Sequence, residues 1–217
     1  MNDYIDLYCE RILPGLWNEP LNAVSNISFF IAAWAIWQLA QRQQQKVPTS
    51  IYILIILTTT IGIGSTLLHT FAQKWAYLLD VIPIFVFQLC FLWLYSRQVI
   101  RIKYIYTGAL LISFLFLSNF SRQFPNLLNG SLSYLPGLAI LLMLGIYHYQ
   151  KQKNEQFTLF AASGIFLLAL SFRTLDQVIC PYFSSGTHFL WHLFNGMVVY
   201  LSVRALILNW SAKAKAD

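Results

Sequence analysis

Seven apolar runs account for most of this sequence, and each is long enough to cross the hydrocarbon core of a membrane as a helix. They extend over residues 21–40, 51–71, 75–96, 104–120, 132–149, 157–172 and 188–208. A backbone in hydrocarbon must satisfy its own hydrogen bonds, and continuous runs of this length are typical of helices rather than of alternating barrel strands. We therefore predict an all-α membrane protein, a seven-transmembrane helix bundle that forms a single domain over residues 1–217.

Composition excludes several other classes of protein. Of the 217 residues, 58% are hydrophobic and only 10% are charged, whereas soluble domains carry roughly a quarter charged residues. The polar segments between the runs leave no room for a second domain. A net charge of +6 would suit a nucleic-acid partner, but it comes from only 14 basic residues. We expect a membrane as the surroundings of this chain and no nucleic acid as its partner.

The basic residues divide unequally between the two ends of the predicted bundle. If the N-terminus lies outside, the outer segments hold Arg11, Lys74, Arg122 and Arg173, and the other ten basic residues face the cytoplasm. The positive-inside rule therefore predicts an outer N-terminus and a cytoplasmic C-terminus. We expect a multi-pass protein of the cytoplasmic membrane in a prokaryote, or of the ER or Golgi in a eukaryote. Most acidic residues fall on the outer half, which indicates either a cation site or a solvated surface.

Four ionisable residues lie where hydrocarbon tolerates charge poorly, and such residues are functional candidates. His69 ends the second run, Asp80 lies in the first turns of the third, and His188 and His192 open the seventh one helical turn apart. All four fall at the predicted outer end. One histidine at a helix end is usually an interfacial hydrogen-bonding residue, but three with this spacing match a catalytic zinc site. Asp80 would then contact the zinc's water or an imidazole, with the active site on the exoplasmic side.

Ser65 precedes His69 by four residues on the same helical face. The motif containing it is explained either by close helix packing or by a hydroxyl that stabilises an oxyanion. His148, at the inner end of the fifth run, is predicted to be an interfacial residue without partners. Tyr95 is among the aromatic residues predicted to lie in the interfacial belt.

Three cysteines constrain the outer end further. Cys9 and Cys180 both lie in predicted outer segments, where an oxidising compartment would permit a disulfide. Two free thiols are the alternative reading of the same pair. Cys90 lies within a span, and we predict that it is inert.

Several motifs together resemble those of the alkaline ceramidases, in the superfamily that also contains the progestin and adipoQ receptors. The matching pieces are Tyr8-Cys9-Glu10, Glu19-Pro-Leu-Asn22-Ala-Val-Ser25-Asn26, Gly64-Ser65 through His69, Asp80 with Pro83, Leu175-Asp176 with Cys180, and His188-Phe-Leu-Trp191-His192 with Gly196 and Tyr200. The resemblance implies zinc held by His69, His188 and His192, with Asp80 and Ser65 beside it. It also implies a disulfide between Cys9 and Cys180.

The resemblance further implies a calcium site in the acidic segment before the first helix. Its expected ligands are Glu10, Glu19 and the carbonyl of Tyr8, with Asp6 close by. The sequence departs from the family pattern at two positions, since Leu7 stands in place of an aspartate and Ile12 in place of an asparagine.

These observations predict a zinc-dependent amidohydrolase of the membrane. Its substrate would be ceramide or another N-acyl lipid, which is cleaved to a fatty acid and a sphingoid base or amine, with Asp80 as general base and Ser65 as oxyanion donor. Three alternatives use the same histidines: a seven-helix receptor, a zinc or proton transporter, and a purely structural zinc site. The short inner segments disfavour a receptor, and the clustering of polar residues at one end disfavours a transport pathway.

Overall fold

The structure is a computed structural model that describes residues 4–43 and 48–210. Within these residues it is helical, without strands, and seven helices are long and apolar enough to cross a membrane. This confirms the predicted seven-transmembrane fold class. Lys46, Lys213 and Lys215, which belong to the predicted inner basic residues, lie outside the described residues, as do both ends of the predicted domain.

The spans follow the predicted runs closely. They are built, in chain order, from α1 (Pro20–Ser25) with α2 (Ile27–Gln41), α3 (Thr49–Phe71), α4 (Lys74–Tyr95) continued by the π-helical turn η1 (Ser96–Ile100), α5 (Tyr104–Ser121), the 3-10 segment η2 (Leu127–Tyr134) leading into α6 (Leu135–Gln150), α7 (Thr158–Ile179) and α8 (His188–Leu208).

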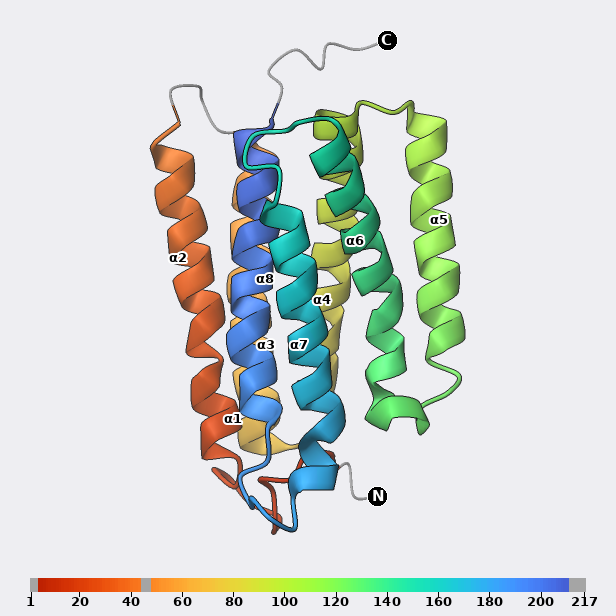
Figure 1. Cartoon of the computed structure of the whole chain (residues 1–217). Coiled ribbons are helices and arrows are strands. Elements are labelled where there is room, and N and C mark those ends of the chain that lie inside the picture. The colour runs from red at the N-terminus through yellow and green to blue at the C-terminus, as the bar shows by residue number, and fades with distance from the viewer. Residues whose placement is uncertain (1–3, 44–47, 211–217) are drawn as a thin grey trace.

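The helices run side by side, and α8 packs against both α7 and α2 (Figure 1). Helices α3 and α4 form another closely packed pair, while α5 lies at the edge of the bundle, mainly against α6 and η2. We call the end where α1 and α8 begin and α3 ends the site end, and the other the opposite end. This arrangement brings the end of α3 and the starts of α4 and α8 together.

Helix α7 is longer than the sequence predicted, because it continues past Phe172 to Ile179. Arg173 was expected to end the span, but its Nη1 donates to the carbonyl of Asn129 and to Ser131 Oγ. Asp176 is also buried, with its carboxylate hydrogen-bonded to backbone amides. Since neither charged residue is left without partners, the helix continues through both.

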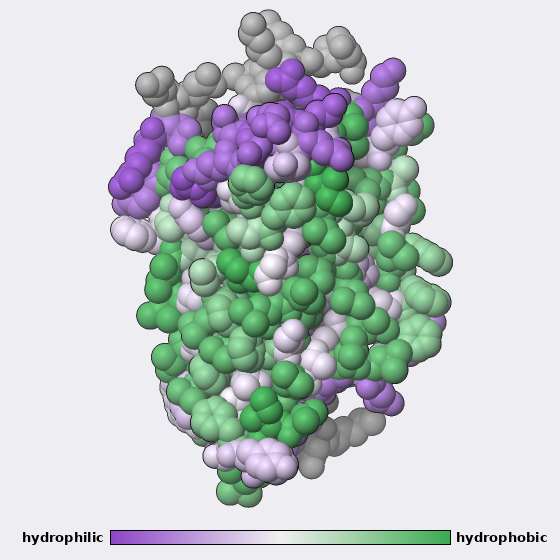
Figure 2. Space-filling view, in the orientation of Figure 1, coloured by the Kyte–Doolittle hydropathy of each residue, from purple (hydrophilic) through white to green (hydrophobic). Residues whose placement is uncertain are grey.

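The face of the bundle seen in Figure 2 is apolar along most of its length. Large side chains such as Trp34, Ile56 and Phe116 are more than 60% exposed, an exposure that suits contact with lipid rather than water. Hydrophilic residues gather mainly at the opposite end, where α8 ends. The direction in which the bundle crosses the membrane remains a prediction.

Two predictions for the opposite end are wrong. His148 was expected to lack partners and Tyr95 to lie in the interfacial belt, but both side chains are fully buried. The Tyr95 hydroxyl bonds to His148 Nδ1, and His148 Nε2 donates to the carbonyl of Asn154 at 3.1 Å. The turn after α6 folds back over the histidine, which supplies a partner that periodicity does not reveal.

Candidate metal centre

Three histidines from two helices meet at the site end, as the sequence predicted. His69 lies in the last turn of α3, and His188 and His192 lie in the first turns of α8. All three are at most 2% exposed, and one ligand atom from each lies within 4.8 Å of the others. Among the described residues this is the one such group of histidine, cysteine or carboxylate side chains, and it could hold a metal ion.

Close packing of α3 against α4 brings Asp80 to the same place. A Cβ at Gly64 would lie 1.9 Å from the carbonyl oxygen of Leu79, so only glycine allows this approach. Asp80 is 9% exposed, and its carboxylate interacts with both Ser65 and His69. The packing and chemical readings of the Gly64-Ser65 motif are therefore compatible, because the glycine sets the helix distance and the serine faces the site.

The hydrogen bonds of His69 and His192 determine which ring nitrogens face the centre. His69 Nδ1 bonds to the Glu19 carboxylate, which can only accept, so Nδ1 carries the proton. Ser25 donates its hydroxyl proton to the carbonyl of Asn22 and thus accepts from His192 Nδ1 at 2.8 Å. In the neutral form of each ring, Nε2 then carries no proton, and the two Nε2 atoms face each other at 3.2 Å. Two lone pairs this close favour a cation at the centre.

His188 completes the group from another side. Its ring stacks on Tyr8, with ring centroids 3.7 Å apart, and its buried Nδ1 has no hydrogen-bond partner among the described residues. Ser65 Oγ lies 3.5 Å from His192 Nε2. Three imidazoles, with the Nε2 atoms of His69 and His192 facing each other and Nδ1 of His188 free of hydrogen bonds among the described residues, fit the ligand set of a catalytic zinc site, which leaves room for a water.

Sequence reasoning missed the residues that orient these imidazoles. Glu19 was predicted as a calcium ligand, yet it bonds to His69, and Ser25 received no role although it bonds to His192. Burial would raise the pKa of Glu19, but hydrogen bonds from His69, Arg11 and Asn22 outweigh burial and hold this pKa below its ordinary value. The spacing of Glu19, Asn22 and Ser25 by three residues, on one helical face, was the available signal.

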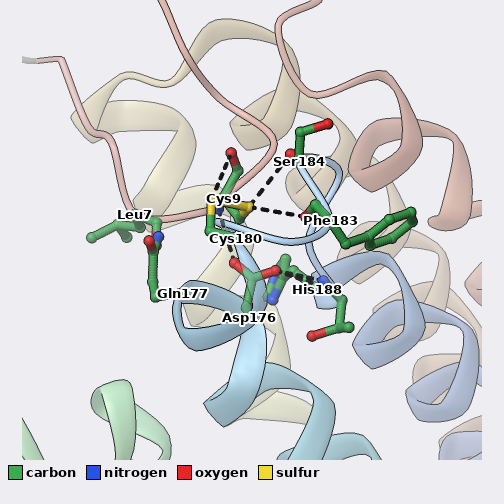
Figure 3. Close-up of a disulfide and its surroundings, with 9 residues drawn as sticks. Leu7, Cys9, Asp176, Gln177, Cys180, Phe183, Ser184 and His188 are labelled. Carbon is green, nitrogen blue, oxygen red and sulfur yellow. Dashed lines mark hydrogen bonds between the residues drawn. A yellow bond between two sulfur atoms is a disulfide. The ribbon is translucent and has the colours of Figure 1, made fainter.

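A disulfide attaches the N-terminal segment to this end of the bundle (Figure 3). Cys9 and Cys180 are joined, which decides between the two readings of this pair, and Cys90 is free. Beside the disulfide, the Asp176 carboxylate accepts from the backbone amides of Cys9, Thr187 and His188. One buried carboxylate thus holds both the segment carrying Tyr8 and the start of α8, where His188 lies.

The predicted calcium ligands do not converge in the same way. The two oxygens of Glu10 accept from the backbone amides of Leu21 and Asn22, at 2.7 and 2.9 Å, and so cap the start of α1. Burial raises the pKa of Glu10, although these amides oppose it. Glu19 faces His69, and Asp6 is exposed. Among the described residues, the histidines are the one group at the site end that could hold a metal ion.

Comparison with known proteins agrees with the resemblance. The family model described as Ceramidase matches residues 8–216, which is nearly the whole chain and includes every residue of the candidate centre. No curated protein matches the chain.

Proposed function

The chain belongs to the ceramidase family, and from this premise we propose that it hydrolyses the amide bond of ceramide or a related N-acyl lipid. The family supports a hydrolase acting on amide bonds. We further propose that His69, His188 and His192 hold a zinc ion and that the chain acts as one domain. On the positive-inside count, the site would lie on the exoplasmic side.

The observation that carries this proposal is the pair of facing Nε2 atoms of His69 and His192. In each ring, Nδ1 donates its proton to Glu19 or Ser25, on the side of the ring away from the facing Nε2 atoms. Such orientation of ligating imidazoles by carboxylates and hydroxyls is typical of metal sites. A zinc ion bound there would supply a Lewis acid and lower the pKa of a water molecule.

Asp80 is the proposed general base. Its carboxylate lies beside Ser65 and His69, and the residue lines a cavity at the site end. It would accept a proton as the water oxygen attacks the carbonyl carbon, and return a proton to the nitrogen as the C–N bond breaks. The Ser65 hydroxyl would donate a hydrogen bond to the oxyanion that develops on the carbonyl oxygen.

Two cavities support a lipid substrate. One of about 500 Å³ at the site end is lined by Asp80, Tyr8 and Arg173. A second, of about 100 Å³, lies deeper and is walled mostly by apolar side chains, among them Phe87, Phe91, Leu141 and Val198. Ile84, Gln88 and Tyr134 line both, so the two adjoin. We propose that the polar part of the lipid lies beside Asp80 and a hydrocarbon chain enters the apolar cavity.

Purified protein tests the proposal directly. We expect zinc close to one ion per chain, and release of fatty acid from ceramide or another N-acyl lipid that stops when the metal is removed and resumes when zinc is restored. If intact, zinc-loaded protein releases no fatty acid from ceramide or from any other N-acyl lipid tested, the enzyme proposal is wrong. Zinc or proton flux into liposomes that is lost in His192→Ala would instead support the transporter, which the apolar deeper cavity disfavours.

A further inference from the structure

Among the described residues, Arg11 is a buried cation whose side chain joins the N-terminal segment to the candidate metal centre, and it was not among the predicted site residues. Its guanidinium is fully buried, with 0% side-chain exposure. Nε pairs with Glu19 Oε1, Nη1 donates to the carbonyl of Gly15 at 2.9 Å, and Nη2 donates to the carbonyl of His69 at 2.9 Å. One carboxylate and two carbonyls thus converge on this guanidinium.

These acceptors are of the kind that a hard cation such as calcium selects, because carboxylate and carbonyl oxygens are its preferred ligands. In the predicted calcium site, the oxygens of Glu10, Glu19 and Tyr8 are also engaged, whereas Asp6 is exposed. Glu19 Oε2 accepts from His69 and from Asn22, and both oxygens of Glu10 accept from backbone amides. The carbonyl of Tyr8 accepts from the amide of Arg11. The residues present do not fit a calcium ion.

Charge leads to the same conclusion. Arg11 and Glu19 neutralise each other in a buried pair, and a divalent cation at these oxygens would lie against the guanidinium. Repulsion between like charges is strong where water is excluded. A planar guanidinium with several fixed donors suits the three acceptors better than a compact lysine ammonium would.

We propose that the Arg11 guanidinium is the resident cation of this segment, takes the place that a calcium ion would need, and positions Glu19 against His69. The chain would then require no calcium for folding or activity. Because Nη2 also holds the carbonyl of His69 in the last turn of α3, Arg11 fixes both the backbone and the imidazole partner of this histidine. This positioning role rests on the proposed metal function of His69, whereas the exclusion of calcium does not.

Calcium binding is the first test, on full-length zinc-loaded protein freed of other divalent ions. At about 1 mM free Ca²⁺, where even weak protein sites fill, equilibrium dialysis with radioactive calcium is expected to show no stoichiometric binding. The melting temperature should be equal with and without the ion. About one calcium per chain, accompanied by a rise in melting temperature, would overturn the proposal.

The cobalt-substituted protein tests the positioning role, since visible absorption of Co²⁺ responds to the arrangement of its ligands. Arg11→Ala should shift this spectrum and weaken metal retention about tenfold or more, as expected for loss of a group that orients a ligand. Arg11→Lys should recover part of both. The matched control is Arg204→Ala, which removes an arginine–glutamate pair at the opposite end and should leave the spectrum unchanged.

A parental cobalt spectrum in Arg11→Ala would overturn the positioning role. If this variant fails to fold, Arg11→Lys and the calcium measurement still decide the matter. Neither readout needs a lipid substrate, so failure of this inference and failure of the proposed hydrolysis are separate results.

Discussion

Both ends of the bundle bury histidine, but they use it differently. At the opposite end, His148 has a partner on each ring nitrogen, with the Tyr95 hydroxyl on Nδ1 and the Asn154 carbonyl on Nε2. At the site end, His69 and His192 have protein partners on Nδ1 and direct Nε2 at each other. Burial alone therefore does not identify a metal ligand. The facing Nε2 atoms of His69 and His192 distinguish the candidate ligands from His148.

The two ends also differ in how many contacts hold the segments around their histidines together. Around the site end, the disulfide of Cys9 with Cys180 and the carboxylates of Glu19 and Asp176 hold four separate segments together. At the opposite end, one hydroxyl and one turn carbonyl are enough to satisfy His148. Such additional contacts are expected around metal ligands, because they hold the ligating side chains in a fixed orientation.

The largest effect is expected from removing a ligand at the site end. His192→Ala should lose bound metal and lower fatty-acid release about 10³-fold or more, since metal assistance contributes several kcal/mol. His148→Ala is the matched change at the opposite end, and it should lower the melting temperature while metal content and release stay near the parental values. Metal loss in His148→Ala, measured by elemental analysis, would contradict the distinction between the two ends.

Asp80→Asn should separate chemistry from structure within the site end. The amide keeps the size of the side chain but cannot act as a base, so fatty-acid release is expected to fall by about 10²–10⁴-fold. Zinc content and melting temperature should remain parental. If the variant instead loses zinc and unfolds at a lower temperature, the centre is a structural metal site and Asp80 belongs to its framework.

Ser25→Ala tests whether hydrogen bonds behind the ligands matter. His192 Nδ1 would lose its acceptor, and metal affinity is expected to fall about 10-fold to 100-fold. Ser202→Ala is a suitable control, because this buried serine bonds only to a carbonyl of its own helix. Competition with a chelator measures both affinities, and equal values for the two variants would remove Ser25 from the centre.

Tyr95→Phe should show the smaller cost of a structural contact. It removes the hydroxyl that bonds to His148 Nδ1 and is expected to destabilise the bundle by about 1 kcal/mol. Metal content and fatty-acid release should not change. A loss of activity comparable to that of Asp80→Asn would mean that the opposite end is coupled to the site.

The sequence predicted the seven spans and the meeting of His69, His188 and His192, because apolar length and helix order determine both. It could not predict that Glu19 faces His69, since that contact joins segments 50 residues apart. For the same reason it missed Arg11, which donates to the carbonyl of His69, 58 residues away, and Asn154, which reaches His148 only through a turn. Spacing along one helix is visible in a sequence, whereas contacts formed by loop closure are not.

The smallest expected effect belongs to an exposed pair at the opposite end. Arg204 bonds to Glu155 and lowers the pKa of this carboxyl below its ordinary value. A lowered folded-state pKa stabilises the protein at pH values above the unfolded-state pKa, and the gain is lost as pH falls through the folded-state value. Glu155 is 40% exposed, so solvent limits the contribution to about 0.5 kcal/mol. Thermal melting of Glu155→Gln should therefore differ from the parent slightly at neutral pH and converge with it in acid. A difference that persists in acid would show that the pair acts through packing rather than charge.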